Sequence, residues 1–161
     1  MLPWLDEVRQ RLVEYAGSRE RAIRKQLGYG YDGIVYSTDC LSAIKGLRYQ
    51  ELYERERDVY LRLYNHDVFE VCGCRIPRLI DYDDRLWVVE METVSPPFVL
   101  DFAGAYLDRK PDFPPDVMRT WQREKRAQFR GDWPRMVSIM AELARHGVHL
   151  ADVKPGNITF R

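Results

Sequence analysis

The sequence lacks long apolar runs, and this argues against a helical membrane protein. No stretch approaches the ~20 consecutive apolar residues that a membrane-spanning helix needs. The first residues also lack the basic segment and apolar run of a secretory signal, because the acidic Asp6 and Glu7 stand there instead. We therefore expect a protein with no membrane partner and a cytoplasmic location.

Cysteine and net charge are also scarce. The three cysteines form an odd set with no second pair to complete a zinc site, so we expect free thiols. The alternative, a metal or redox site at Cys72 and Cys74, lacks further ligands. The 25 basic side chains equal the 25 acidic ones, so the chain has no net positive charge that would favour a nucleic-acid partner.

A glycine-rich segment is the first feature that indicates a function. Gly28, Gly30 and Gly33 precede Val35 in the spacing G-x-G-x-x-G-x-V. Glycines let backbone N–H groups approach phosphate oxygens, and the valine can cover a flat base. A dinucleotide-binding fold would need a helix directly after the third glycine. Here the apolar runs 34–36 and 41–45 flank a polar turn instead, so we predict a strand-loop-strand hairpin that binds a nucleotide.

A lysine and a glutamate follow this hairpin. Ala43 precedes Lys45 by two residues, which leaves room for a purine while the amine reaches toward phosphates. Glu56 falls on an apolar stripe that repeats at helical spacing over residues 52–63. Because a carboxylate that faces a core needs a cationic partner, we expect Glu56 to pair with Lys45.

The segment 152–157 carries three polar groups with complementary chemistry. In a phosphoryl-transfer site, Asp152 can accept the proton of an attacking hydroxyl, Lys154 can neutralise charge on the transferred group, and Asn157 can ligate magnesium. The alternative interpretation is structural: Asp152 and Asn157 brace a turn, and Lys154 is solvated.

With these motifs in one order, the chain from Leu27 to Asn157 resembles the eukaryotic-like protein kinase family. The resemblance implies an α+β fold with a five-stranded antiparallel N-lobe sheet, a helix that carries Glu56, and a reduced helical C-lobe. It also implies ATP and magnesium as cofactors, and phosphoryl transfer to a protein Ser/Thr or another hydroxyl. Residues 1–95 would form the N-lobe and residues 96–161 the C-lobe.

The resemblance also assigns a hinge to residues 88–94. Met91 would guard the back of the nucleotide pocket, while Glu92 and Val94 would offer backbone groups to an adenine edge. Lys45 and Lys154 would stabilise phosphate charge, and Glu56 would position Lys45.

The chain departs from the family pattern at two places. Leu150-Ala151 stands where the family has His-Arg, and no D-F-G segment follows Asn157. In the family that aspartate holds magnesium, and both metal contacts are needed. Three interpretations therefore remain open: an active reduced kinase, a catalytically inactive pseudokinase that binds nucleotide or acts as a scaffold, and a fragment of a longer kinase.

The rest of the chain predicts further elements. Residues 133–146 predict a helix with an apolar stripe. Either the preceding basic segment or a second copy of the chain, as in a homodimer, covers its outer face, or this lobe is poorly closed. That basic segment offers a surface for an acidic substrate, or simply a solvated helix face. Its cations are Arg119, Arg123, Lys125, Arg126 and Arg130. The other expected helices span 3–16, 98–107 and 117–129, and the other expected strands span 22–26, 76–82 and 86–91.

Overall fold

The computed structural model describes residues 2–99, 102–151, 153–155 and 158–161. It is a mixed α+β structure with a five-stranded antiparallel sheet in the order β1-β2-β3-β7-β6. The predicted sheet is thereby confirmed, with small shifts at the strand ends. Its strands are β1 (Ile23–Tyr29), β2 (Gly33–Thr38), β3 (Ser42–Leu47), β6 (Leu79–Asp83) and β7 (Val88–Glu92).

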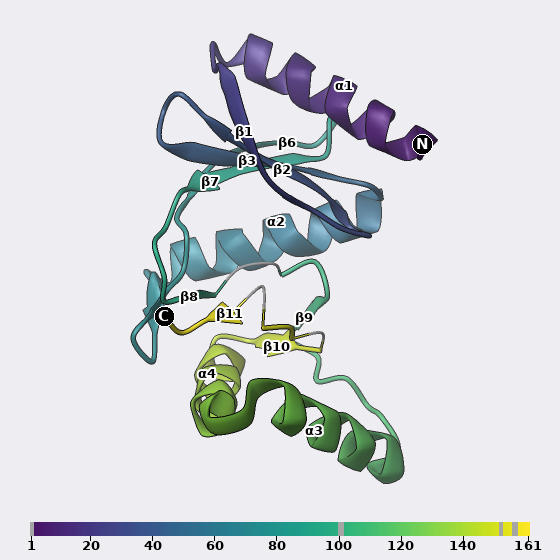
Figure 1. Cartoon of the computed structure of the whole chain (residues 1–161), viewed down its shortest axis with the longest axis vertical. Coiled ribbons are helices and arrows are strands. Elements are labelled where there is room, and N and C mark those ends of the chain that lie inside the picture. Colours follow the sequence, from purple (N-terminus) through teal and green to yellow (C-terminus); the bar gives the residue numbers. More distant parts are fainter. Residues whose placement is uncertain (1, 100–101, 152, 156–157) are drawn as a thin grey trace.

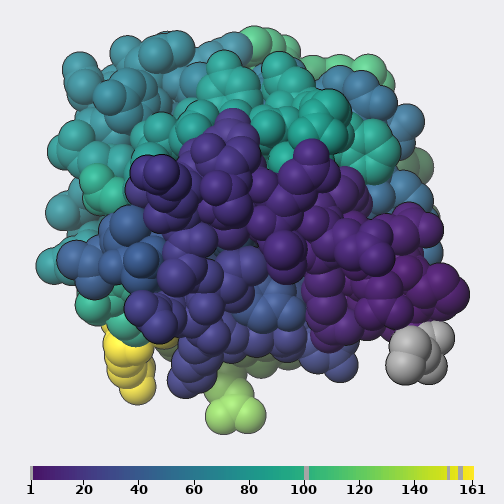
Figure 2. Space-filling view, turned by 90° about the horizontal axis from the view of Figure 1, so that it is seen from above, coloured from purple at the N-terminus to yellow at the C-terminus, as the bar shows by residue number. Residues whose placement is uncertain are grey.

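Two helices cover the two faces of this sheet (Figure 1). The helix α1 (Pro3–Ser18) lies on the outer face, where Val8 and Leu12 are fully buried. Figure 2 looks onto this face and shows α1 in purple beside the blue strands. Close approach requires Gly46, because a Cβ at this position would lie 2.7 Å from Val8 and 2.9 Å from Leu12. The helix α2 (Gln50–Asn65) lies on the opposite face and carries Glu56.

The rest of the chain packs below α2 (Figure 1). It contains the helices α3 (Pro115–Phe129) and α4 (Trp133–Arg145), joined by a single 3₁₀ turn, Arg130–Asp132. Short strands complete this part: β4 (Glu70–Val71), β5 (Cys74–Arg75), β8 (Phe98–Val99), β9 (Ala105–Leu107), β10 (Val148–Leu150) and β11 (Ile158–Thr159). They form one sheet in the order β11-β8-β5-β4 and a β9–β10 pair.

The predicted helix over 98–107 is wrong. Both described ends of this segment are strands: Phe98–Val99 pairs with β11, and Ala105–Leu107 pairs with β10. These partners lie about forty or more residues further along the chain, so the local pattern does not reveal them. The second half of the molecule is therefore less helical than expected.

The two clustered cysteines belong to a hairpin. Cys72 and Gly73 connect β4 to β5 with φ values of 49° and 78°. Burial raises the pKa of both the Cys72 and the Cys74 thiols, so they stay protonated at neutral pH. Over the described ranges, no group of three or more His, Cys, Asp or Glu side chains is arranged to hold a metal ion. The hairpin accounts for these cysteines as turn and core residues.

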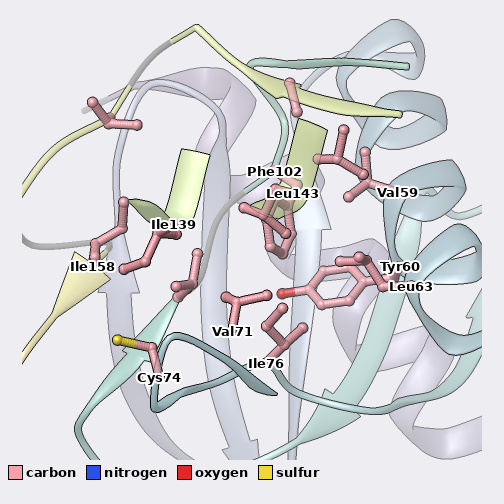
Figure 3. Packing of buried hydrophobic residues seen from close by; sticks show 14 of the residues in the cluster. Val59, Tyr60, Leu63, Val71, Cys74, Ile76, Phe102, Ile139, Leu143 and Ile158 are labelled. Atoms are coloured by element: carbon pink, nitrogen blue, oxygen red, sulfur yellow. The ribbon is translucent and has the colours of Figure 1, made fainter. Parts of the chain in front are cut away.

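One large hydrophobic core joins α2 to the lower elements (Figure 3). Tyr60 of α2 meets Phe102 edge-on, with ring centroids 5.2 Å apart. Ile139 and Leu143 of α4 and Ile158 of β11 enter the same cluster. The core thus holds the end of the chain against the helix that carries Glu56.

The helix predicted over 133–146 forms as α4, and it ends just before Gly147, whose φ of 77° suits a glycine. α3 packs on α4 through the edge-on pair Trp121–Trp133, with centroids 6.2 Å apart. The basic segment therefore covers part of the outer face of α4, and the homodimer stays a prediction. None of the helices in the described ranges is long and apolar enough to cross a membrane.

Candidate functional site

A pocket of about 790 Å³ opens between the glycine-rich hairpin, α2 and the segment after β7. This volume lies within the range of small-molecule sites, roughly 300–1,000 Å³. Every described residue that was predicted to bind a nucleotide lines it. The lining includes Leu27, Gly28, Tyr29, Gly30, Tyr31, Asp32, Gly33, Val35, Ala43, Lys45, Glu56, Tyr60, Pro77, Met91, Glu92, Thr93, Val94 and Lys154.

The ion pair expected from the sequence is present in the wall of this pocket. Lys45 Nζ lies 2.7 Å from Glu56 Oε2 and 3.0 Å from Oε1. Both residues are buried, at 7% and 1% exposure. β3 presents the amine and α2 presents the carboxylate, so the pair joins the sheet to the helix. A cation held this way beside a pocket is pre-organised for an anionic group.

The glycines of the hairpin serve two different purposes. The turn between β1 and β2 is closed by the Gly30 N–H, which donates to Gly33 O at 3.0 Å. Cβ atoms at Gly28 and Gly30 would meet nothing within 4 Å, so both positions border open space. A Cβ at Gly33 would lie 2.0 Å from the carbonyl oxygen of Gly46. Gly33 is therefore required by strand packing, whereas Gly28 and Gly30 leave room for a ligand.

Part of the pocket lining on β3 and β7 is apolar, and the backbone of Val94 lies just beyond it. Ala43 and Met91 face each other across β3 and β7, and both are 6% exposed. The prediction assigns backbone groups of Glu92 and Val94 to a ligand edge; of these, the Glu92 N–H already donates to Arg78 O at 2.9 Å. Among the residues that the structure describes, none makes a hydrogen bond with the backbone of Val94. Val94 can thus offer its N–H and C=O to a ligand edge.

Lys154, the predicted phosphate-binding lysine of the segment 152–157, also lines the pocket. Asp152 and Asn157, the predicted proton acceptor and metal ligand, lie outside the described residues. The described part of their loop is anchored from below: Val153 is buried, and its carbonyl oxygen accepts a hydrogen bond from Lys125 Nζ at 2.6 Å. α3 therefore supports the segment that contains the predicted catalytic residues.

Lys125 was predicted among the surface cations, and its burial is a correction. It is 8% exposed, while its basic neighbours Arg119, Arg123, Arg126 and Arg130 are exposed. The sequence does indicate this burial, because Lys125 lies four residues from both Trp121 and Phe129, which places it on the apolar face of α3.

Glu90 points away from the pocket. Strand alternation places Val89 and Met91 on the pocket side of β7 and Glu90 on the side of α1. Its carboxylate, 0% exposed, accepts hydrogen bonds from Tyr15 Oη at 2.8 Å, Ser42 Oγ at 2.7 Å and Arg21 Nε at 2.9 Å. Burial and this carboxylate raise the pKa of the Tyr15 phenol. Among the described lining residues the acids are Asp32, Glu56 and Glu92.

No protein-family model and no curated protein matches the chain.

Proposed function

We propose that this protein has a protein kinase-like fold and that its main pocket binds ATP for phosphoryl transfer to a hydroxyl group. The observation that carries the proposal is the buried Lys45–Glu56 ion pair, with Nζ–Oε distances of 2.7 and 3.0 Å, in the wall of a pocket that the glycine-rich hairpin closes. An amine held beside open glycine positions suits a phosphate chain.

Each part of the pocket supports one part of the nucleotide. The apolar wall formed by Val35, Ala43 and Met91 fits a flat base, and the backbone of Val94 can pair with its edge. Lys45 would contact phosphate oxygens, and Glu56 would hold the amine in place. Lys154, which also lines the pocket, would add a second positive charge. The residues therefore fit a nucleoside triphosphate in shape and in charge.

Phosphoryl transfer would use the segment that Lys125 anchors. Asp152 would orient the acceptor hydroxyl and take its proton, while Lys154 would stabilise charge on the transferred group. Magnesium, when bound with the nucleotide, would neutralise phosphate charge, and Asn157 is its proposed ligand. The acceptor is proposed to be a protein Ser/Thr or another hydroxyl compound.

A second candidate is a pseudokinase that binds nucleotide without turnover. One observation favours it: one of the described lining acids, Glu56, is already engaged by Lys45. Binding and turnover are therefore proposed separately and need separate measurements.

The test is a calorimetric titration of MgATP into the protein and into Lys45→Ala, beside assays of phosphate release and autophosphorylation. Binding is expected in the wild type, and we expect a loss of affinity of about 100-fold in Lys45→Ala because a charge-assisted phosphate contact disappears. Lys25→Ala is the matched control, since this exposed lysine of β1 is not among the residues that line the pocket, and it is expected to leave binding unchanged.

The outcomes separate the two candidates. Binding with turnover supports the phosphotransferase, and binding without turnover supports the pseudokinase. If the wild type shows no ATP binding while it is folded by circular dichroism, both are excluded.

A further inference from the structure

The tip of the glycine-rich hairpin meets a single arginine. Arg48 directly follows β3, and its guanidinium carbon lies 5.2 Å from the ring centroid of Tyr31 at the hairpin tip. The same carbon lies 4.8 Å from the ring of Tyr49. The rings of Tyr31 and Tyr49 are themselves 6.2 Å apart. Cation–π attraction therefore joins the hairpin tip to the end of β3.

A backbone hydrogen bond also joins the hairpin tip to the end of β3. The Arg48 N–H donates to the carbonyl oxygen of Asp32 at 2.7 Å, one residue beyond Tyr31. The side chains of Tyr29 and Tyr31 are 68% and 69% exposed, so they add little packing of their own at the hairpin tip. Arg48 thus contacts the hairpin tip through both its side chain and its backbone.

A third ring comes from α1. Trp4, in the first turn of this helix, lies with its ring centroid 4.7 Å from the Arg48 guanidinium carbon. α1 is firmly attached to the sheet, because Arg11 donates to Leu47 O at 2.9 Å and to Leu86 O at 2.7 Å. The Trp4 ring is therefore presented to Arg48 from a fixed element, and the guanidinium has aromatic partners from three separate segments.

We propose that Arg48 is a positioning residue of the nucleotide site, which holds the glycine-rich loop over the pocket through Tyr31 while Trp4 and Tyr49 hold Arg48. This proposal rests on the proposed function. It makes α1, which precedes the glycine-rich hairpin in the chain, a part of the nucleotide site although α1 lines no part of the pocket. Loop position, and with it nucleotide affinity, would respond to anything that displaces the start of α1.

The experiment combines hydrogen exchange of the free protein with binding of a fluorescent MgATP analogue. In Arg48→Ala the backbone bond to Asp32 can persist, so the variant removes only the contacts of the side chain. We expect faster exchange at the Gly30 amide, which closes the turn, and about tenfold weaker nucleotide binding from the loss of three cation–π contacts. Trp4→Ala is expected to act in the same direction with a smaller effect.

Two further variants separate loop positioning from general stability. Arg48→Lys keeps a cation among the rings and is expected to restore most of the affinity. Arg9→Ala removes an exposed arginine of α1 whose side-chain hydrogen bonds, within the described residues, go to Asp6 and Tyr36, and it is expected to change neither exchange nor binding. The melting temperatures of the variants show whether a loss of affinity merely follows a loss of fold.

The hydrogen-exchange result does not depend on nucleotide. Unchanged exchange at Gly30 in Arg48→Ala would overturn the proposal whether or not ATP binds. Faster exchange with unchanged affinity would overturn the nucleotide role of Arg48 and leave the proposed function intact. If the wild type binds no nucleotide, the proposed function fails and the role of Arg48 in the nucleotide site fails with it, while the exchange data still report its hold on the loop.

Discussion

Each face of the central sheet buries a carboxylate, and the two carboxylates have different roles. On the outer face, Glu90 is enclosed between β7 and α1 and accepts hydrogen bonds from Tyr15, Ser42 and Arg21. On the inner face, Glu56 from α2 meets Lys45 at the wall of the large pocket. Both side chains are almost completely buried, at 0% and 1% exposure.

The surroundings of each carboxylate explain the difference. Donors from α1, from β3 and from the connection between α1 and β1 surround Glu90, which is not among the lining residues of the large pocket, so this network joins α1 to the sheet. The Lys45–Glu56 pair borders open volume, so the amine can exchange part of its interaction with a ligand. A buried charge whose hydrogen bonds are all made within the fold stabilises the packing of the elements around it. A buried charge beside a cavity is a candidate binding group.

The largest effect is expected from Glu90→Ala. Its removal leaves the Tyr15 and Ser42 hydroxyls without their buried acceptor and opens a cavity, so we expect a loss of about 4 kcal/mol in the free energy of unfolding. Urea denaturation measures this loss. Glu92→Ala, two residues further along the same strand and half-exposed, should change stability little. Equal effects from the two variants would show that the buried hydrogen bonds of Glu90 add nothing to stability.

The next effect separates stability from binding at the inner face. Lys45→Met leaves Glu56 buried without its amine and should cost about 3 kcal/mol of unfolding free energy. The double variant Lys45→Met/Glu56→Leu should recover most of that stability, because apolar residues can replace a buried ion pair. Nucleotide affinity, measured by calorimetry, should stay low in both. Recovered binding in the double variant would show that the pair is structural, like Glu90.

Two glycines offer a smaller test of the same contrast. Gly33→Ala places a Cβ against the carbonyl of Gly46, so we expect a loss of about 2 kcal/mol in stability. Gly30→Ala borders open space and should cost less than about 1 kcal/mol. Thermal unfolding compares the two variants. A larger loss in Gly30→Ala than in Gly33→Ala would contradict the assignment of Gly33 to strand packing and of Gly30 to ligand space.

The smallest effect concerns an exposed carboxylate. A hydrogen bond from Tyr53, supported by Arg57, lowers the pKa of Asp84. A lowered folded-state pKa contributes stability above the unfolded value of about 3.9, and this contribution disappears as the pH falls through the folded pKa. Denaturation of the wild type and Asp84→Asn at several pH values should therefore show a small difference at pH 7 that vanishes in acid. A difference that grows in acid would have the wrong sign.

Much of the first half of the chain could be predicted from sequence. The strand pattern, the helical stripe around Glu56 and the need of a core-facing carboxylate for a cation together predicted the Lys45–Glu56 pair, and the distances confirm it. Those signals are local, since each depends on residues a few positions apart. Asp152 and Asn157 stay predictions, because they lie outside the described residues.

The structure of the second half of the chain was harder to predict from the sequence, and particular residues show why. Phe98–Val99 pairs with β11 and β5, and Ala105–Leu107 pairs with β10, so both strands depend on partners that are distant in the chain. Lys125 shows its apolar neighbours at helical spacing, yet its bond to the Val153 carbonyl depends on how α3 is placed beneath the loop.

The sequence by itself determined most strands of the central sheet, the helix of Glu56 and the pairing of that acid with Lys45, because periodicity and charge burial act over short distances. Only the tertiary structure decided which carboxylates face the pocket, which glycine is a packing glycine, and that Arg48 meets rings from three segments. Those outcomes depend on where distant backbones approach one another, and no local pattern of residues encodes that distance.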